Sequence, residues 1–194
     1  MVGVVPNPVE FGKQIPTTYF SPTYSPFYQN SSQGVSMSHS LSSPIAYASF
    51  LHNLPTRYPF IHSSSLVYIP LGTKVGKSMG MVMFADNLIL CVQEFLNFEL
   101  QVIEGYSYEV SRSLIPLTEL PAAKDYCRAS YPTKEKEYGY DSFPHPHDLT
   151  LAMTHPHHKH IHPDIKHHLI PAPELTFTAP NLPVLLEEIA RVFK

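Results

Sequence analysis

Histidine residues are concentrated in one short stretch of this chain. Nine of the 12 histidines lie between His145 and His168, and they are densest in Thr154–Asp164, which reads THPHHKHIHPD. The imidazole side chain titrates near neutral pH and is also the commonest metal ligand in proteins. The stretch therefore predicts a site of acid–base chemistry or of metal binding.

Repeated prolines limit the conformations of this stretch. They exclude a long helix, and with it the i, i+4 ligand spacing of the HExxH zinc motif. We predict a loop with extended pieces that crosses one end of a sheet. In an extended piece, His158 and His160 point to one face and Lys159 points to the other. His157 and Ile161 share the face of Lys159. The prolines are Pro144, Pro146, Pro156 and Pro163.

Metal binding is one function that these residues predict. Three imidazoles with an open coordination position form the type of zinc centre that hydrolyses bonds. The candidate ligands are His145, His147, His158 and His160, with Asp141 as a fourth or an outer ligand. The chain is then a divalent-metal-binding protein or a zinc hydrolase. A non-catalytic interaction module, in which the histidines bind backbone groups or a partner protein, is the other alternative that the residues leave open.

Alternating apolar residues after about Lys77 predict an antiparallel sheet. The first two strands, residues 80–84 and 88–95, are joined by a tight turn at Asp86-Asn87, since these residues tolerate positive φ. Glu94 continues the apolar row of the second strand, so its carboxylate lies at the sheet edge or points into a pocket. The further predicted strands are residues 99–103, 106–112, 126–131 and 138–143, with a solvated turn at residues 134–137.

The C-terminal residues predict one amphipathic helix. Asn181 suits the N-cap, Pro183 suits the first turn, and the apolar residues form one stripe. The stripe consists of Leu182, Leu185, Ile189, Val192 and Phe193. We therefore predict an α+β domain over residues 77–194, with an antiparallel β-sheet, the C-terminal helix packed on one face and the Pro/His-rich loop at one end.

Residues 1–75 differ in composition from the rest of the chain. Only three charged residues, Glu10, Lys13 and Arg57, precede residue 74, and Ser, Pro and Tyr dominate without helical or strand periodicity. We predict a low-complexity, mostly disordered segment with one short strand at Leu66–Pro70. Met79 or Met81 is then a candidate for the natural start of the protein.

The composition excludes some classes of function. The net charge of −3 gives no global attraction to nucleic acid, so positive charge for an RNA partner must be local. No apolar run approaches the roughly 18 residues that span a bilayer, and the N-terminus has no recognisable secretory signal. Cys91 and Cys127 have no CxxC spacing, so we predict two reduced thiols in a cytoplasmic protein that does not contact a membrane.

From about Gly80 onward the chain resembles the TumE family of toxin–antitoxin proteins. The most specific part of the resemblance is Thr154–Ile161 together with Pro180–Pro183 and Leu186–Ile189. The other matching residues are Glu94, Tyr106, Tyr108, Tyr140–Ser142, His145, His147, Pro163–His167 and Ile170–Pro173. The family often has Arg directly before Tyr-Asp, where this chain has Gly139. Arg128, on a neighbouring predicted strand, is the candidate to replace that Arg.

The resemblance implies the toxin component of a toxin–antitoxin system, a small ribonuclease inhibited by a cognate antitoxin. Cleavage of RNA without a metal needs a base for the 2′-hydroxyl, an acid for the leaving oxygen and a cation near the phosphate. We assign His158 and His160 as base and acid in either order, Lys159 or Arg128 to the phosphate, and Asp141 or Glu94 to orient an imidazole.

Overall fold

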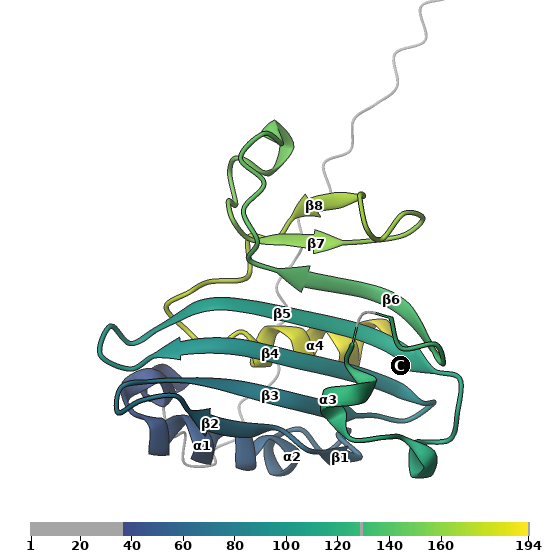
Figure 1. The fold of residues 1–194 in the computed structure, drawn as a ribbon, viewed down its shortest axis with the longest axis horizontal. Coiled ribbons are helices and arrows are strands. Elements are labelled where there is room, and N and C mark those ends of the chain that lie inside the picture. The colour runs from purple at the N-terminus through teal and green to yellow at the C-terminus, as the bar shows by residue number, and fades with distance from the viewer. Residues whose placement is uncertain (1–36, 129, 194) are drawn as a thin grey trace, which may run out of the picture. The chain divides into compact units, whose positions relative to one another are not determined.

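The computed structural model describes residues 37–193 with the exception of residue 129. This part of the chain contains an antiparallel sheet of eight strands in the order β3–β4–β5–β6–β7–β8, with β1 and β2 both paired along the outer edge of β3 (Figure 1). The strands are β1 (Ser63–Ser64), β2 (Val67–Pro70), β3 (Val75–Met83), β4 (Leu88–Asn97), β5 (Val102–Ser113), β6 (Lys134–Asp141), β7 (His158–His160) and β8 (Leu169–Pro171).

Helices pack on both faces of this sheet, which confirms the predicted α+β class. α1 (Pro44–His52) and α4 (Leu182–Val192) share one large apolar core, and we call their side of the sheet the helix face. α3 (Ala123–Tyr126) packs on the opposite side, which we call the α3 face; Figure 1 shows α4 behind the sheet and α3 in front of it. The shorter elements are α2 (Leu54–Arg57) and the 3₁₀ turns η1 (Met37–Ser42), η2 (Leu117–Glu119) and η3 (Leu149–Leu151). No helix within the described residues is long and apolar enough to cross a membrane.

The β3–β4 hairpin forms as the sequence predicts. Asp86 and Asn87 have φ angles of +54° and +58°, the left-handed values that a tight hairpin turn needs. Successive side chains of β4 alternate between the two faces, and from Leu88 to Val92 both sets are buried, whereas Gln93 and Phe95 are exposed. Leu90 packs into the core of the helix face, whereas Ile89 contacts the cluster around Tyr126 of α3. Strand β4 is therefore the central strand of both apolar layers.

Helix α4 begins after Asn181, but the Asn181 side chain does not cap it. The side-chain carbonyl of Asn181 accepts a hydrogen bond from the Thr176 backbone N–H at 2.9 Å, and its amide donates one to the Tyr108 hydroxyl at 3.3 Å. Asn181 therefore ties the helix start to β5. Leu182, Leu185 and Ile189 of the predicted apolar stripe are buried, whereas Val192 is 59% exposed and Phe193, directly after the helix, is partly buried.

Two predicted strands are absent from the structure. Residues 99–103 do not form a strand of their own, because a turn with Gln101 at φ +57° leads directly into the long strand β5. Tyr126 ends α3, and none of the described residues between 127 and 131 belongs to a strand. Their apolar and aromatic residues resemble a strand in sequence, but Tyr126 is used to cover the α3 face.

The charged residues 134–137 begin β6, although the sequence predicts a solvated turn. Lys134 and Lys136 point to the same face and both form ion pairs with Glu109 of the neighbouring strand β5. On β5, Arg112 forms an ion pair with Glu137 at 3.1 Å. These partners are more than 20 residues away in the chain, so a local pattern of charges does not reveal them.

Residues 37–75 are folded, in contrast to the disorder that their composition predicts. They form η1, α1, α2, β1 and β2, and the predicted short strand corresponds to β2. Tyr47 of α1 and Leu54 of α2 are completely buried in the core. Ile45 and Ala48 lie on the exposed side of α1, so this helix has no charged face that would mark it in the sequence. The predicted disorder of residues 1–36 lies outside the described residues.

Met79 and Met81, the two candidate start sites, lie inside β3. Gly80 between them has φ +145°, and a Cβ there would lie 2.5 Å from the Ser65 carbonyl oxygen. The strand therefore needs a glycine where the chain passes from β1 to β2. A chain that began at Met79 would lack β1, β2 and part of β3.

Cys91 of β4 and Cys127, directly after α3, form a disulfide with a Cα–Cα distance of 5.6 Å. The prediction of two reduced thiols is therefore wrong. Their spacing does not reveal the bond, because the two residues meet only when Tyr126 packs α3 onto the sheet. Disulfides are typical of oxidising compartments, so the cysteines no longer support the prediction of a cytoplasmic protein.

Candidate functional site

The pairing of β6 with β7 brings an aspartate next to two histidines. Asp141 is directly opposite His158, and His160 lies two residues further on, on the same face of β7. His158 Nε2 is 3.0 Å from Asp141 Oδ1, and His160 Nε2 is 3.0 Å from Asp141 Oδ2. The two Nε2 atoms are 3.1 Å apart. We call these three side chains the Asp–His cluster; the sequence predicted that His158 and His160 point to one face.

Backbone carbonyls fix the orientation of both imidazole rings. His158 Nδ1 is 2.9 Å from the carbonyl oxygen of Pro156, and His160 Nδ1 is 2.8 Å from that of Ile165. A carbonyl oxygen only accepts hydrogen bonds, so each Nδ1 carries a proton and donates. Each ring therefore turns its Nε2 atom toward the carboxylate of Asp141.

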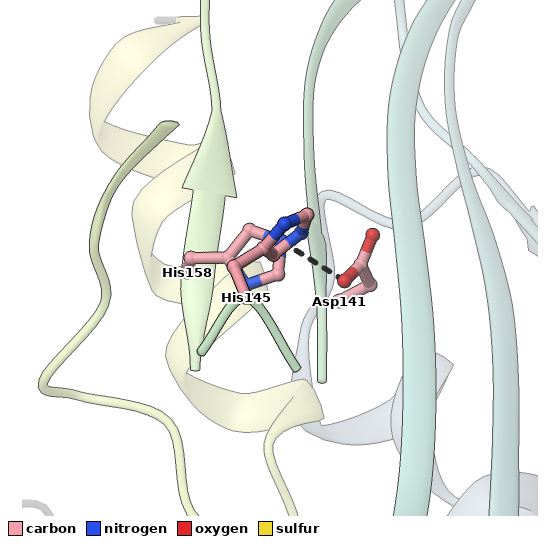
Figure 2. A group of neighbouring side chains, drawn as sticks. All are labelled: Asp141, His145 and His158. Atoms are coloured by element: carbon pink, nitrogen blue, oxygen red, sulfur yellow. Dashed lines mark ion pairs between the residues drawn. The ribbon is translucent and has the colours of Figure 1, made fainter. Parts of the chain in front are cut away.

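A third imidazole lies beside the cluster. The rings of His145 and His158 are perpendicular, with centroids 4.7 Å apart. One ligand atom each of Asp141, His145 and His158 lies within 4.8 Å of the others, and Figure 2 shows the two imidazoles side by side, facing the carboxylate. His147, the other predicted ligand in this loop, is exposed and does not belong to this group. The structure thus brings together three of the four predicted histidine ligands and Asp141.

The cluster is a strongly polarised environment. Partial burial acts to raise the pKa of Asp141, but the hydrogen bonds from His158, His160 and the Phe143 backbone N–H outweigh it and hold that pKa well below its usual range. Burial likewise acts to lower the pKa of His158, and its contacts with Asp141 and the Pro156 carbonyl reverse the direction and raise it. The His158 side chain is 1% exposed, whereas those of His160 and Asp141 are 19% and 27% exposed. Solvent therefore reaches the cluster from the side of Asp141 and His160.

Lys159, predicted to hold a phosphate, points to the opposite face of the sheet. Its ammonium group lies 4.0 Å from the ring centre of Tyr138 and 5.1 Å from that of Tyr140, and it forms an ion pair with Glu188 of α4. A cation over aromatic faces with a carboxylate partner attaches β7 to the helix layer. Lys159 does not lie with the imidazoles of its two neighbours.

Glu94, the alternative carboxylate, is completely buried on the helix face. It accepts hydrogen bonds from the hydroxyls of Ser78 at 2.5 Å and Tyr108 at 2.7 Å, and also from Tyr47 of α1. Burial raises the pKa of Glu94 despite these three donors. The structure therefore places Glu94 in the core between β4 and α1, and Asp141 is the carboxylate that contacts imidazoles.

A groove on the α3 face leads away from the cluster. Asp141 is paired with Ser107 of β5, so these side chains share that face. A cavity of about 470 Å³ is lined by Asp141, His160, Lys166 and other residues of β5 and β6. A second cavity of about 340 Å³ reaches α3, and the two share the lining residues Ser107, Glu109 and Lys136. The two cavities therefore adjoin on the α3 face, and we refer to them together as the groove.

Several cations line this groove, and of these the sequence had suggested only Arg128. Lys124 and Arg128 lie at its α3 end, Lys136 in its middle and Lys166 beside the cluster. Arg128 lies in the turn after α3, and not on a strand, but it does line the groove as a candidate phosphate contact. The only signal for Lys136 was the alternation of Lys and Glu in residues 134–137, which places alternate charges on one face of a strand.

His157 has a separate partner on the helix face. Its Nδ1 atom is 2.7 Å from the Tyr106 hydroxyl, and the two rings are stacked with an interplanar angle of 2°. Burial lowers the pKa of His157. His157 therefore packs as an aromatic ring beside the core, and its partner Tyr106 is buried together with the neighbouring Tyr108.

Comparison with known proteins identifies the family. No curated protein and no solved structure matches the chain. The model of the family described as Toxin TumE matches residues 57–193. This range contains the whole sheet, the Asp–His cluster and α4, and it starts well before Gly80, where the resemblance in sequence begins. Because the match covers more than half of the chain, this protein belongs to the Toxin TumE family.

Proposed function

We propose that this protein is the toxin component of a toxin–antitoxin system and that it cleaves RNA at the Asp–His cluster. Family membership supports the toxin role. The observation that carries the RNA part is the position of the cluster, at one end of a groove whose other residues include four cations. The whole chain has a net charge of −3, so the attraction of RNA in this proposal depends on the local cations of the groove.

The cluster contains the groups that phosphodiester cleavage requires. A base must take the proton of the 2′-hydroxyl, an acid must protonate the leaving oxygen, and positive charge must face the phosphate in the transition state. The Nε2 atoms of His158 and His160 lie 3.1 Å apart and both contact the Asp141 carboxylate, which raises the pKa of His158. The groove side of the cluster, at Asp141 and His160, is where a substrate has access.

Phosphate contacts in this proposal come from the groove and not from Lys159. Lys124, Arg128 and Lys166 are exposed, so their charges are free to attract an RNA strand. Lys136 is partly neutralised by Glu109. Single-stranded RNA fits this arrangement, because cations spaced along a groove follow a phosphate backbone without reading its sequence. A cognate antitoxin would inhibit the toxin by covering the groove.

Induced expression of the full chain tests the proposal. We expect growth arrest and loss of intact cellular RNA, and rescue by the antitoxin encoded beside the toxin. The His158→Ala, His160→Ala double variant should abolish both effects. The matched control is His167→Ala, His168→Ala, because these histidines are equally close in sequence but exposed and outside the cluster.

Folding of each variant is checked by its thermal melting curve, so that loss of toxicity is not confused with loss of structure. A folded double variant that still arrests growth would contradict the proposed role of the cluster. Growth arrest with intact RNA would contradict RNA as the target. An absence of any effect of the intact chain, with or without an antitoxin, would favour the non-catalytic interaction module.

A further inference from the structure

We infer that the Asp–His cluster is a binding site for one divalent transition-metal ion, with zinc the best match. The proposed ligands are Asp141, His158 Nε2 and His160 Nε2, and His145 is the side chain placed to complete the coordination. The inference concerns the same site as the proposed function and gives it a cofactor. Metal binding itself can be tested without any assumption about RNA.

The first argument is the geometry of the ligand groups. His158 Nε2 lies 3.0 Å from Asp141 Oδ1, His160 Nε2 lies 3.0 Å from Asp141 Oδ2, and the two Nε2 atoms are 3.1 Å apart. Zinc is bound by imidazole nitrogen and carboxylate oxygen at about 2.0–2.1 Å in a tetrahedral arrangement, in which neighbouring ligand atoms are about 3.3 Å apart. Each of the three contacts is therefore within a few tenths of an ångström of the separation that neighbouring zinc ligands have.

The second argument is the placement of protons. Because each Nδ1 proton is donated to a carbonyl oxygen, a neutral ring turns an Nε2 lone pair toward Asp141 and toward the other ring. Without protons on Nε2, three sets of lone pairs face one another. With one such proton, only one of the two contacts between a ring and Asp141 is a hydrogen bond. With two, both contacts with Asp141 are hydrogen bonds, but two protonated rings meet at the Nε2–Nε2 distance of 3.1 Å. One divalent cation resolves all of these contacts together.

The third argument is the outer support of the ligands. Metal-binding histidines usually donate the proton of their other ring nitrogen to a carbonyl or carboxylate, which fixes the tautomer and the ring orientation. Pro156 and Ile165 provide that carbonyl for His158 and His160. The ligands also lie on paired strands, so the backbone holds them at fixed separation before any ion arrives.

The ligand types favour zinc among the common ions. Magnesium and calcium prefer sites made of oxygen ligands, whereas two or three imidazoles with a carboxylate suit zinc and its transition-metal neighbours. His145 comes from the loop between β6 and β7 and lies within 4.8 Å of Asp141 and His158. A bound ion of this type supplies positive charge at the phosphate and lowers the pKa of a water ligand. With an ion bound, His158 and His160 would act as its ligands, and this role would replace the base and acid roles considered for them in the proposed function.

The test is a measurement of metal content and affinity in the full-length protein. Protein purified without an affinity tag is dialysed extensively, and its zinc is measured by inductively coupled plasma mass spectrometry. We expect about one zinc per chain, released by a strong chelator and restored by added zinc chloride. The chelated protein should melt at a lower temperature, and cobalt(II) added in place of zinc should give the visible absorption of a tetrahedral site.

Variants distinguish zinc binding at the Asp–His cluster from non-specific zinc binding by the other histidines of the chain. Asp141→Asn, His158→Ala and His160→Ala should each weaken zinc binding at least tenfold, whereas the His167→Ala, His168→Ala control should leave it unchanged. Less than a tenth of an equivalent of zinc in the intact protein, or equal affinity in the cluster variants and the control, would overturn the inference.

The outcomes also distinguish the metal site from the proposed function. If the protein holds one zinc at these residues but affects neither growth nor RNA, the metal site stands and the proposed function fails. If the protein retains no zinc and cleaves RNA fully in the presence of chelator, the metal inference fails and the two imidazoles act as base and acid.

Discussion

Asp141 and His158 occupy directly opposed positions on β6 and β7, and their side chains meet at 3.0 Å. The contact is therefore determined by strand register and not by the conformation of a loop. Sixteen residues connect the two strands. A longer or shorter connection would keep the contact between Asp141 and His158 as long as the strand register is unchanged. A one-residue slip would move His158 and His160 to the helix face and destroy the site.

The groove cations should contribute to RNA binding. We expect the Lys124→Ala, Arg128→Ala double variant to bind single-stranded RNA at least fivefold more weakly. The dependence of log affinity on log salt should also become shallower, by about 0.7 for each phosphate that the variant no longer neutralises. The measurement is fluorescence anisotropy with labelled RNA at several salt concentrations.

A suitable control for this prediction is Lys74→Ala, Arg191→Ala, which removes one exposed lysine and one exposed arginine away from the groove. Equal reductions of affinity in the two double variants would mean that net charge, and not the groove, attracts RNA.

Ionisation of Glu94 should make the fold less stable as pH rises. Burial raises the folded-state pKa of this carboxyl above its usual value of 4.5, so the folded protein binds the proton more tightly than the unfolded chain. Below pH 4.5 Glu94 is protonated in both the folded and the unfolded chain, so its ionisation costs no stability. The loss of stability develops as pH rises from 4.5 through the folded-state pKa. Glu94→Gln lacks this ionisation, so its stability relative to the unchanged protein should increase with pH.

The free energy of unfolding in urea, measured between pH 4 and pH 8, checks the effect of Glu94. Glu99→Gln, at an exposed position, serves as the control and should show no such trend. A difference between Glu94→Gln and the unchanged protein that stays constant with pH would contradict the prediction.

The disulfide should stabilise the sheet. Cys91 and Cys127 are separated by 36 residues, and closing a loop of that length in the unfolded chain is worth about 3–4 kcal/mol. Reductant should therefore lower the free energy of unfolding by about that amount. The Cys91→Ala, Cys127→Ala variant should be equally destabilised and insensitive to reductant. Two reactive thiols per chain in denatured, unreduced protein would show that the bond does not form.

Residues 37–78 should be necessary for folding. A chain that begins at Met79 lacks α1 and α2, whose Tyr47 and Leu54 are completely buried, and leaves the outer edge of the sheet without its partners. We expect this fragment to be insoluble or to melt without cooperativity. The comparison is a chain that begins at residue 37, which keeps every described element and should show one cooperative transition. Cooperative melting of the shorter fragment would contradict the prediction.

Local patterns in the sequence were sufficient for some elements and insufficient for others. The β3–β4 hairpin and α4 follow from turn residues and an apolar stripe, which act within a few residues. Strand β6 depends on Glu109, far away in the chain, and α1 depends on the sheet that it covers. Such elements are stabilised by contacts that a sequence window does not contain.

The same distinction applies to the site. Alternation on one strand correctly predicted that His158 and His160 share a face and that Lys159 does not. The alternation did not predict which distant carboxylate lies beside the two histidines. Bulges in the β4–β5 and β5–β6 pairs shift the strand register, so residue positions on one strand do not predict their partners on another. Asp141 and Glu94 were therefore equal candidates in the sequence, although only Asp141 reaches the imidazoles.

Main-chain carbonyl groups at Pro156 and Ile165 orient both rings of the cluster. Every amino acid has such a carbonyl, so replacing either side chain removes no hydrogen-bond acceptor. The alignment of the two rings therefore depends on the path of the backbone at positions 156 and 165, and not on a side-chain acceptor at either position. A substitution there would disturb the cluster only by moving the main chain.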